Sequence, residues 1–156
     1  MNTGPKTNQP SQLCRAGKCV GLFAALLLFN LQPAFAQAPS FDDVPESYWA
    51  YNFVEIFAAN GISAGCGGGS FCPENLVTRA QMAVFLERAM NGSDYVPPPA
   101  SGTDFTAIGV ADFAANLIEQ LASDGITAGC AGGNYCPDAP VTRAQMAVFL
   151  LRAKYG

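Results

Sequence analysis

Histidine is absent from this chain of 156 residues, and lysine and arginine are scarce. Histidine is the commonest general base and a frequent metal ligand near neutral pH, so its absence argues against hydrolytic or metal catalysis, and no cofactor is expected. Only eight residues are basic, against twelve that are acidic. Because nucleic acids and anionic membranes attract basic patches, the composition also argues against both as partners.

The chain also lacks an apolar run long enough for a membrane span, which needs about 20 residues. Its longest apolar run, residues 19–31, follows three basic residues and precedes Ala34-Phe35-Ala36. A basic start, a short apolar stretch and an Ala-x-Ala motif are typical of a secretory signal peptide. We predict a signal peptide over residues 1–36, cleaved after Ala36, with an uncleaved N-terminal anchor as the alternative.

Cleavage would remove three basic residues and no acidic ones, leaving five against twelve and a formal charge of −7. The 120 residues that remain suit one small domain or two subdomains that share a core. A signal peptide implies export, so we expect the protein in the periplasm, at the cell surface or outside the cell.

The mature chain is a tandem duplication. Residues 41–89 align without a gap to residues 105–153 at a constant offset of 64, and 26 of the 49 pairs are identical. Residues 77–86 recur letter for letter as residues 141–150. Repeats of this kind bury a face against one another, so we expect one copy to be unstable alone. The predicted parts of the mature chain are a first repeat over 37–92, a proline-rich linker over 93–103 and a second repeat over 104–156.

The linker contains three consecutive prolines, which favour an extended, semi-rigid spacer between the repeats; a proline-rich ligand for another domain is the alternative. Each repeat is predicted to fold as a helix, a glycine-rich loop and a second helix, which makes the protein mainly α. In the first helix of each repeat, apolar residues keep helical spacing. These residues are Trp49, Phe53, Ile56 and Phe57 in the first copy, and Phe113, Leu117 and Leu121 in the second.

The second helix of each repeat opens on the duplicated ten-residue segment. A threonine followed three residues later by a glutamine predicts a reciprocal capping box at its N-terminus. The two boxes are Thr78 with Gln81 and Thr142 with Gln145. The apolar stripes that follow are Met82, Phe85, Leu86 and Ala89, then Met146, Phe149, Leu150 and Ala153.

Arg79 and Arg143 fall in the first turn of these capped helices, off the apolar stripe. A cation there opposes the helix dipole by roughly 0.3 to 1 kcal/mol, so stability alone would not select arginine. Two interpretations stay open: a solvated surface arginine, or an arginine that faces an anion together with the free first-turn N–H groups. In either case its removal should barely affect folding.

Four cysteines remain after cleavage, two at matching positions in each loop. In an exported chain they are expected to be oxidised, and pairing within each loop is the simplest of three connectivities. A four-cysteine zinc site is the alternative, although structural zinc favours shorter spacings. The predicted disulfides are Cys66 with Cys72 and Cys130 with Cys136.

Five motifs follow one another along the first repeat: Phe41-x-Asp43-Val44-Pro45, Trp49-Ala50, Gly61-Ile62, Gly69-Ser70-Phe71-Cys72-Pro73 and Val77-Thr78-Arg79-Ala80-Gln81. In these motifs and their order the chain resembles the S-layer homology domain family, over nearly all of its predicted mature length. The resemblance implies a bundle, usually of three repeats, whose grooves bind acidic cell-wall polysaccharide through the signature arginine. The residues it suggests for glycan binding are Arg79, Trp49, Asp43 and Gly65 in the first repeat, and Arg143, Phe113 and Gly129 in the second.

The chain departs from the family pattern in three ways. Glutamine replaces the signature glutamate at positions 81 and 145, only two repeats are present, and the second repeat has Ala107-Ile108-Gly109 and Phe113 in place of Asp43-Val44-Pro45 and Trp49. The first repeat is therefore expected to dominate glycan binding. The paired loop cysteines are also unlike the plain form of the family.

We expect a non-catalytic, exported module that attaches to acidic polysaccharide of the cell envelope or the extracellular space. The alternative is an assembly module that associates with itself or with other chains of the family without binding sugar. A small hydrolase using Asp43 and nearby acids is a third hypothesis, and it lacks an assembled nucleophile, base and orienting partner.

Overall fold

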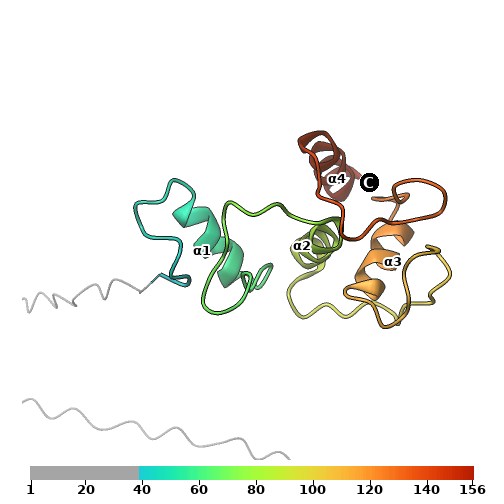
Figure 1. The fold of residues 1–156 in the computed structure, drawn as a ribbon, viewed down its shortest axis with the longest axis horizontal. Helices are drawn as coiled ribbons and strands as arrows, with labels where there is room; N and C mark the ends of the chain where they lie inside the picture. The colour runs from blue at the N-terminus through green and yellow to red at the C-terminus, as the bar shows by residue number, and fades with distance from the viewer. Residues whose placement is uncertain (1–38) are drawn as a thin grey trace, which may run out of the picture. The chain divides into compact units, whose positions relative to one another are not determined.

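A computed structural model describes residues 39–156, and the predicted signal peptide and its cleavage site lie outside them. Figure 1 shows the order of its helices: α1 (Tyr51–Ala59), α2 (Arg79–Asn91), α3 (Ala115–Ser123) and α4 (Arg143–Tyr155). Each repeat is a helix, a loop and a second helix, as predicted, and the described part of the chain is mainly helical. Across residues 39–156, no helix has the length and apolarity that a membrane crossing requires.

The second helix of each repeat begins at its capping box. The Thr78 hydroxyl accepts a hydrogen bond from the Gln81 backbone N–H (3.2 Å), and the Gln81 side chain accepts one from the Thr78 N–H (3.0 Å). Thr142 and Gln145 make the same two bonds. These bonds satisfy first-turn N–H groups that have no partner inside the helix, and they fix the start of α2 and α4.

A local disulfide closes the glycine-rich loop of each repeat. The bonds Cys66–Cys72 and Cys130–Cys136 each join Cα atoms 6.0 Å apart, which confirms the predicted pairing within each loop. In the first repeat the Asp43 carboxylate also holds this loop, because it accepts hydrogen bonds from the backbone N–H groups of Phe71 (2.7 Å) and Cys72 (2.8 Å). The bond from Phe71 is the main cause that lowers the pKa of Asp43.

The main core lies between the repeats. Helix α2 packs against both α3 and α4 (Figure 1). Met82, Ala83 and Leu86 of α2 are buried in one cluster with residues of the second repeat. The second-repeat members of this cluster are Phe105, Ile108, Ala115, Ile118, Leu121, Ile126, Tyr135 and Phe149. The two repeats therefore share one core, as the duplication predicted.

Helix α1 differs from the prediction. Trp49 precedes the helix and is 82% exposed, and Phe53 and Ile56 are also exposed. The buried side chain of α1 is Val54, which packs with Phe41 and Val44 in a small separate cluster. The predicted stripe stays open to solvent because α2 directs its apolar face at the second repeat. Phe57 of this stripe does contact α2, because its ring centroid lies 5.2 Å from that of Phe85.

The equivalent stripes in the second repeat are also only partly buried. Phe113 precedes α3 and is exposed, whereas Leu117 is half-buried and Leu121 is fully buried. In α4, Phe149 is buried but Leu150 is 53% exposed. The equivalent Leu86 of α2 is 5% exposed. The same sequence is thus core in one repeat and surface in the other, because no element in residues 39–156 covers that side of α4.

The proline-rich linker does not separate the repeats. Pro97 is buried and Ala100 packs against the main core. The Glu119 carboxylate of α3 accepts hydrogen bonds from the backbone N–H groups of Ser101 (2.6 Å) and Gly102 (2.8 Å). These contacts hold the linker against α3, while α2 contacts the second repeat directly.

Candidate functional site

Arg79 is the first residue of α2 and is only 3% exposed. Its backbone N–H donates to the Ala139 carbonyl (2.9 Å), and the N–H of Ala80 donates to the Pro137 carbonyl (3.0 Å). Both acceptors belong to the loop of the second repeat. That loop therefore covers the first turn of α2, and it takes up N–H groups that the sequence left free for solvent or an anion.

The guanidinium of Arg79 is held by the same loop. Its Nε donates to the Tyr135 carbonyl (2.8 Å) and its Nη2 lies 3.4 Å from the Thr127 hydroxyl. Its Cζ lies 4.7 Å from the ring centroid of Tyr135 and 5.4 Å from that of Phe149, within the range of a cation–π contact. The Tyr135 hydroxyl donates in return to the Arg79 carbonyl (2.9 Å).

These contacts correct the interpretation of Arg79 as a solvated surface residue, and they occupy the first-turn N–H groups that were expected to face an anion with it. Its side chain joins the two repeats, and burial of a charge is tolerated only where hydrogen bonds and stacking replace water. Tyr135 shares this environment, since burial raises the pKa of its hydroxyl to about 12 although Arg79 lowers it. Loss of Arg79 should therefore affect folding, contrary to the expectation from its place in the helix.

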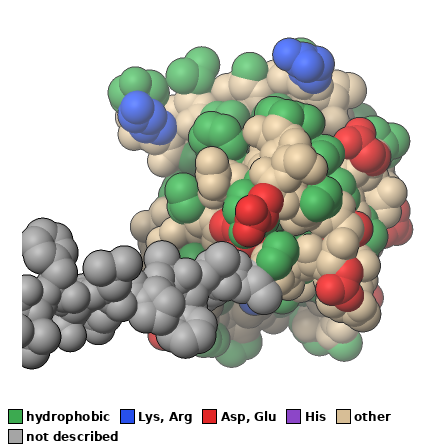
Figure 2. Space-filling model, turned by 90° about the vertical axis from the view of Figure 1, so that its left-hand side faces the viewer, with side chains coloured by type: hydrophobic (Ala, Val, Ile, Leu, Met, Phe, Trp, Pro, Cys, Tyr) green, Lys and Arg blue, Asp and Glu red, His purple; other side chains and the backbone are tan. Residues whose placement is uncertain are grey.

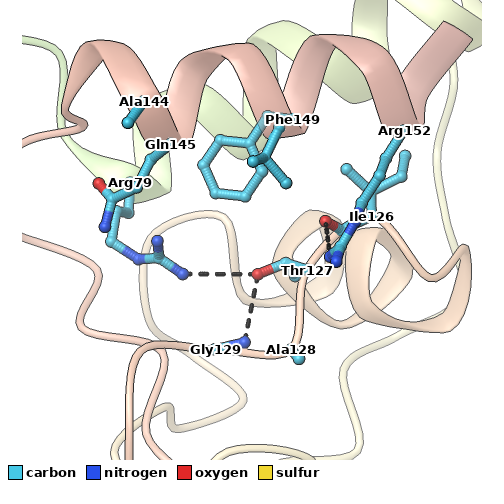
Figure 3. Close-up of a pocket in the computed structure, with 10 residues that line it drawn as sticks. Arg79, Ile126, Thr127, Ala128, Gly129, Ala144, Gln145, Phe149 and Arg152 are labelled. Atoms are coloured by element: carbon cyan, nitrogen blue, oxygen red, sulfur yellow. Dashed lines mark hydrogen bonds between the residues drawn. The ribbon is translucent and has the colours of Figure 1, made fainter.

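A pocket of about 320 Å³ opens beside this arginine (Figure 3). Its walls come from α2, from α4 and from the loop of the second repeat. The residues that line it are Arg79, Ile126, Thr127, Ala128, Gly129, Ala144, Gln145, Val148, Phe149 and Arg152. None of them is acidic, although acidic residues outnumber basic ones in the chain as a whole.

Two arginines flank the pocket. Figure 3 shows Arg79 on one side and Arg152 of α4 on the other, with Thr127 between them. Arg152 Nη1 donates to the Ile126 carbonyl (3.1 Å), which positions its guanidinium against the loop. Within residues 39–156, neither Arg79 Nη1 nor Arg152 Nη2 makes a hydrogen bond. The pocket therefore offers oriented cationic donors to an anion.

Gly129 lets the loop form this wall. Its φ is +86°, a left-handed conformation that favours glycine. A Cβ on Gly129 would clash with the Asn134 carbonyl and press on the Phe105 ring. The Gly129 N–H donates to the Thr127 hydroxyl (3.2 Å), the same oxygen that faces Arg79.

The structure groups the predicted glycan residues differently from the sequence. It brings Arg79 of the first repeat to Gly129 of the second, and the rings beside the guanidinium are Tyr135 and Phe149. The other predicted residues do not line this pocket. Trp49 and Phe113 are exposed, Asp43 holds the first loop, Gly65 lies in that loop, and Arg143 is exposed at the start of α4.

Sequence reasoning missed Thr127, Tyr135 and Arg152. Arg152 had a detectable signal, because an arginine recurs at the equivalent position of the first repeat, Arg88. Thr127 and Tyr135 had none, since their importance depends on a contact between residues far apart in the chain.

Comparison with known proteins supports the resemblance seen in the sequence. The sequence profile of the S-layer homology domain matches residues 40–83 and 107–147, which is more than half of the chain. A cell wall amidase of Bacillus anthracis, itself uncharacterised, is 30% identical over 146 residues, covering 92% of this chain and 26% of that protein. The S-layer protein EA1 of the same organism is 25% identical over 130 residues, covering 83% of this chain and 15% of that protein.

The similarity to an enzyme also covers most of this chain and only a small part of the relative. An endoglucanase of Bacillus sp. (strain KSM-635) is 27% identical over 134 residues, covering 86% of this chain but 14% of that protein. The chain thus spans about a quarter or less of the length of these relatives.

Proposed function

Because the chain belongs to the S-layer homology domain family, we propose that it is a non-catalytic module that attaches to an acidic polysaccharide of the cell envelope. The family includes S-layer proteins, and the chain is accordingly a protein of the cell surface or the extracellular space. The observation that carries the proposal is the pocket flanked by Arg79 and Arg152.

The charge of this pocket supports an anionic ligand. The mature chain is acidic overall, so a polyanion is repelled from most of its surface. The pocket is an exception because both of its charged residues are arginines. A guanidinium presents paired N–H donors whose spacing matches a carboxylate. An acidic substituent on a sugar is therefore the chemical group that the pocket suits best.

The rigidity of Arg79 supports binding as well. Its Nε and Nη2 groups are committed to Tyr135 and Thr127, so the side chain loses little conformational freedom when an anion arrives. Preorganisation of this kind improves affinity by lowering the entropy cost of binding. Gln145 also lines the pocket, and its side-chain nitrogen makes no hydrogen bond within residues 39–156. That amide can donate to a sugar hydroxyl.

This assignment changes the residues expected to bind glycan. Within the proposed site, Arg79 and Gly129 remain from the sequence prediction, and Arg152, Thr127 and Gln145 join them. Trp49 is not needed, because Phe149 supplies an apolar surface inside the pocket. The first repeat contributes one arginine and the second repeat contributes the rest, so neither repeat dominates.

Binding to purified envelope polysaccharide tests the proposal, with residues 37–156 and their disulfides intact. Arg152 is the better residue to change, since it is exposed and its loss removes only one hydrogen bond of the fold, the one to the Ile126 carbonyl. A charge-assisted hydrogen bond contributes about 1.5 to 3 kcal/mol, so Arg152→Ala should weaken binding by about 10- to 100-fold. Lys154→Ala is the matched control, because it removes the same charge from α4 outside the pocket.

The glycan should be tested with and without its acidic substituents. Removal of those groups should weaken binding of the glycan to the parent protein. It should also abolish the difference in affinity between the parent and Arg152→Ala. The proposal would be overturned if Arg152→Ala bound like Lys154→Ala, or if removal of the acidic groups changed nothing.

A further inference from the structure

In the second repeat, a set of residues that we call the socket surrounds the Arg79 side chain. The first repeat has the equivalent residues, but no arginine lies among them. Five residues around the Arg79 side chain have partners 64 positions earlier in the chain. In order, Thr127, Gly129, Tyr135, Gln145 and Phe149 correspond to Ser63, Gly65, Phe71, Gln81 and Phe85. All five of these counterparts line one cavity of about 180 Å³. The first repeat thus has the socket but holds no arginine in it.

The matching arginine is present at the other end of the chain. Arg143 begins α4 in the same ten-residue context as Arg79, yet it is exposed. It borders an open groove of about 390 Å³ together with Val141, Met146 and Leu150. The equivalent groove on α2 is filled by the second repeat, which buries Met82 and Leu86. Arg143, which we call the plug, therefore lies in no socket within residues 39–156.

The backbone groups of plug and socket are complementary too. Within the chain, Arg79 and Ala80 donate to the carbonyls of residues 139 and 137, and the Val141 N–H donates to the Val77 carbonyl (3.0 Å). Within residues 39–156, the N–H groups of Arg143 and Ala144 make no such bond. On the socket side the counterparts of residues 137, 139 and 140 are Pro73, Asn75 and Leu76, and Leu76 is 78% exposed.

The charges of the two surfaces are opposite. The groove on α4 is lined by one charged residue, the exposed and basic Arg143. The first repeat carries exposed acids around its loops, among them Asp42, Glu46 and Glu74. Figure 2, which faces the side where α1 lies in Figure 1, shows acidic and hydrophobic side chains over this face, and prominent basic ones at its upper edge. Opposite charges favour association and fix its orientation.

We propose that a second copy of this chain fills the socket of the first repeat with its own Arg143, so that chains associate head to tail. The contact between chains reproduces the contact that α2 and the second loop make within one chain. It buries Leu150, as the equivalent Leu86 is buried within the chain, places Leu76 at the rim of the socket, and gives the N–H groups of Arg143 and Ala144 acceptors. Such an interface is heterologous and produces a ring if its rotation closes, or an open filament if it does not.

This association goes beyond attachment to glycan and does not depend on it. The residues that line the socket and the groove of Arg143 do not line the pocket between Arg79 and Arg152, and the contact shares with that pocket only the backbone of Ala144. The two activities can therefore be tested and lost separately.

Sedimentation of residues 37–156 over a concentration series, without glycan, tests the proposal. The parent should associate as concentration rises. Arg143→Ala removes the plug, and Leu76→Lys places a positive charge, which repels Arg143, at the rim of the socket. Each should weaken association at least tenfold while circular dichroism stays unchanged, because both residues are exposed. Lys154→Ala, the matched loss of a charge on α4, should associate like the parent.

Mixing the two variants sharpens the test. A chain with Arg143→Ala keeps its socket and a chain with Leu76→Lys keeps its plug, so an equimolar mixture should form a one-to-one dimer and nothing larger. A parent that stays monomeric throughout the series would overturn the proposal. So would variants that associate like the parent, or a mixture that stays monomeric while the parent associates.

Discussion

Helices α2 and α4 open on the same ten residues and carry the same capping box, yet their surroundings differ. In α2 the arginine is buried under the loop of the other repeat, and in α4 it faces solvent. Since the local sequence is identical, the difference comes from tertiary contacts alone. The same arginine is therefore an interior residue that joins the repeats where a second element covers it, and a surface residue where none in residues 39–156 does.

The largest difference between the copies should appear when each arginine is removed. Arg79→Ala loses a buried charge-assisted hydrogen bond and stacking on two rings, which together should cost about 2 to 4 kcal/mol of unfolding free energy. Arg143→Ala should change stability by about 0.5 kcal/mol or less, as an exposed position. Urea unfolding of residues 37–156 in dilute solution measures both. Equal effects of the two variants would contradict the comparison.

Glu87, which directly follows the duplicated segment, gives a second difference between α2 and α4. It is buried in α2, whereas its equivalent in α4 is the exposed Leu151. Burial is the main cause that raises the pKa of Glu87 from 4.5 to about 7, the nearby charge of Asp124 adds to it, and a hydrogen bond from Asn91 opposes it. The folded state therefore holds a proton that the unfolded chain releases at lower pH.

The sign of the pH dependence follows from this raised pKa. The stability that the protonated Glu87 contributes is present below pH 4.5 and is lost as pH rises to about 7. Glu87→Gln should flatten this decline, so its melting temperature should exceed that of the parent more at pH 8 than at pH 4. Glu46→Gln, at an exposed acid, is the control and should leave the decline in place. If the melting temperatures of Glu87→Gln and of the parent changed by the same amount between pH 4 and pH 8, that result would argue against a buried, protonated Glu87.

A smaller effect is expected at the aromatic residue under the arginine. Tyr135→Phe removes the hydroxyl that donates to the Arg79 carbonyl, at a cost of about 1 kcal/mol. Its equivalent in the first repeat is already a phenylalanine, Phe71, so Phe71→Tyr should give no matching gain in the monomer. Thermal unfolding of both variants checks the pair. An unchanged midpoint for Tyr135→Phe would mean that this bond does not help to join the repeats.

The features that sequence predicts well here are local. The capping boxes depend on residues three apart, and each disulfide joins cysteines six apart, so pattern and spacing are sufficient to find them. The duplication also predicted a shared core, because a single repeat exposes too much apolar surface.

What the sequence could not predict is which side of each helix is covered. Trp49 and Leu150 carry the apolar character of core residues, but no neighbour in residues 39–156 buries them. Arg79 has the character of a surface residue, and only a loop some 50 residues away, at Thr127 to Ala139, makes it part of the interior. Long-range contacts of this kind leave no periodic signal.

Amide hydrogen exchange in dilute, monomeric protein tests the central comparison most directly. Arg79 and Ala80 have the same neighbours in sequence as Arg143 and Ala144, so their exchange rates differ only through structure. We expect strong protection of the Arg79 and Ala80 N–H groups, which donate to the second loop, and rapid exchange at Arg143 and Ala144. Equal exchange at the two pairs would contradict the claim that the second repeat covers the arginine of the first.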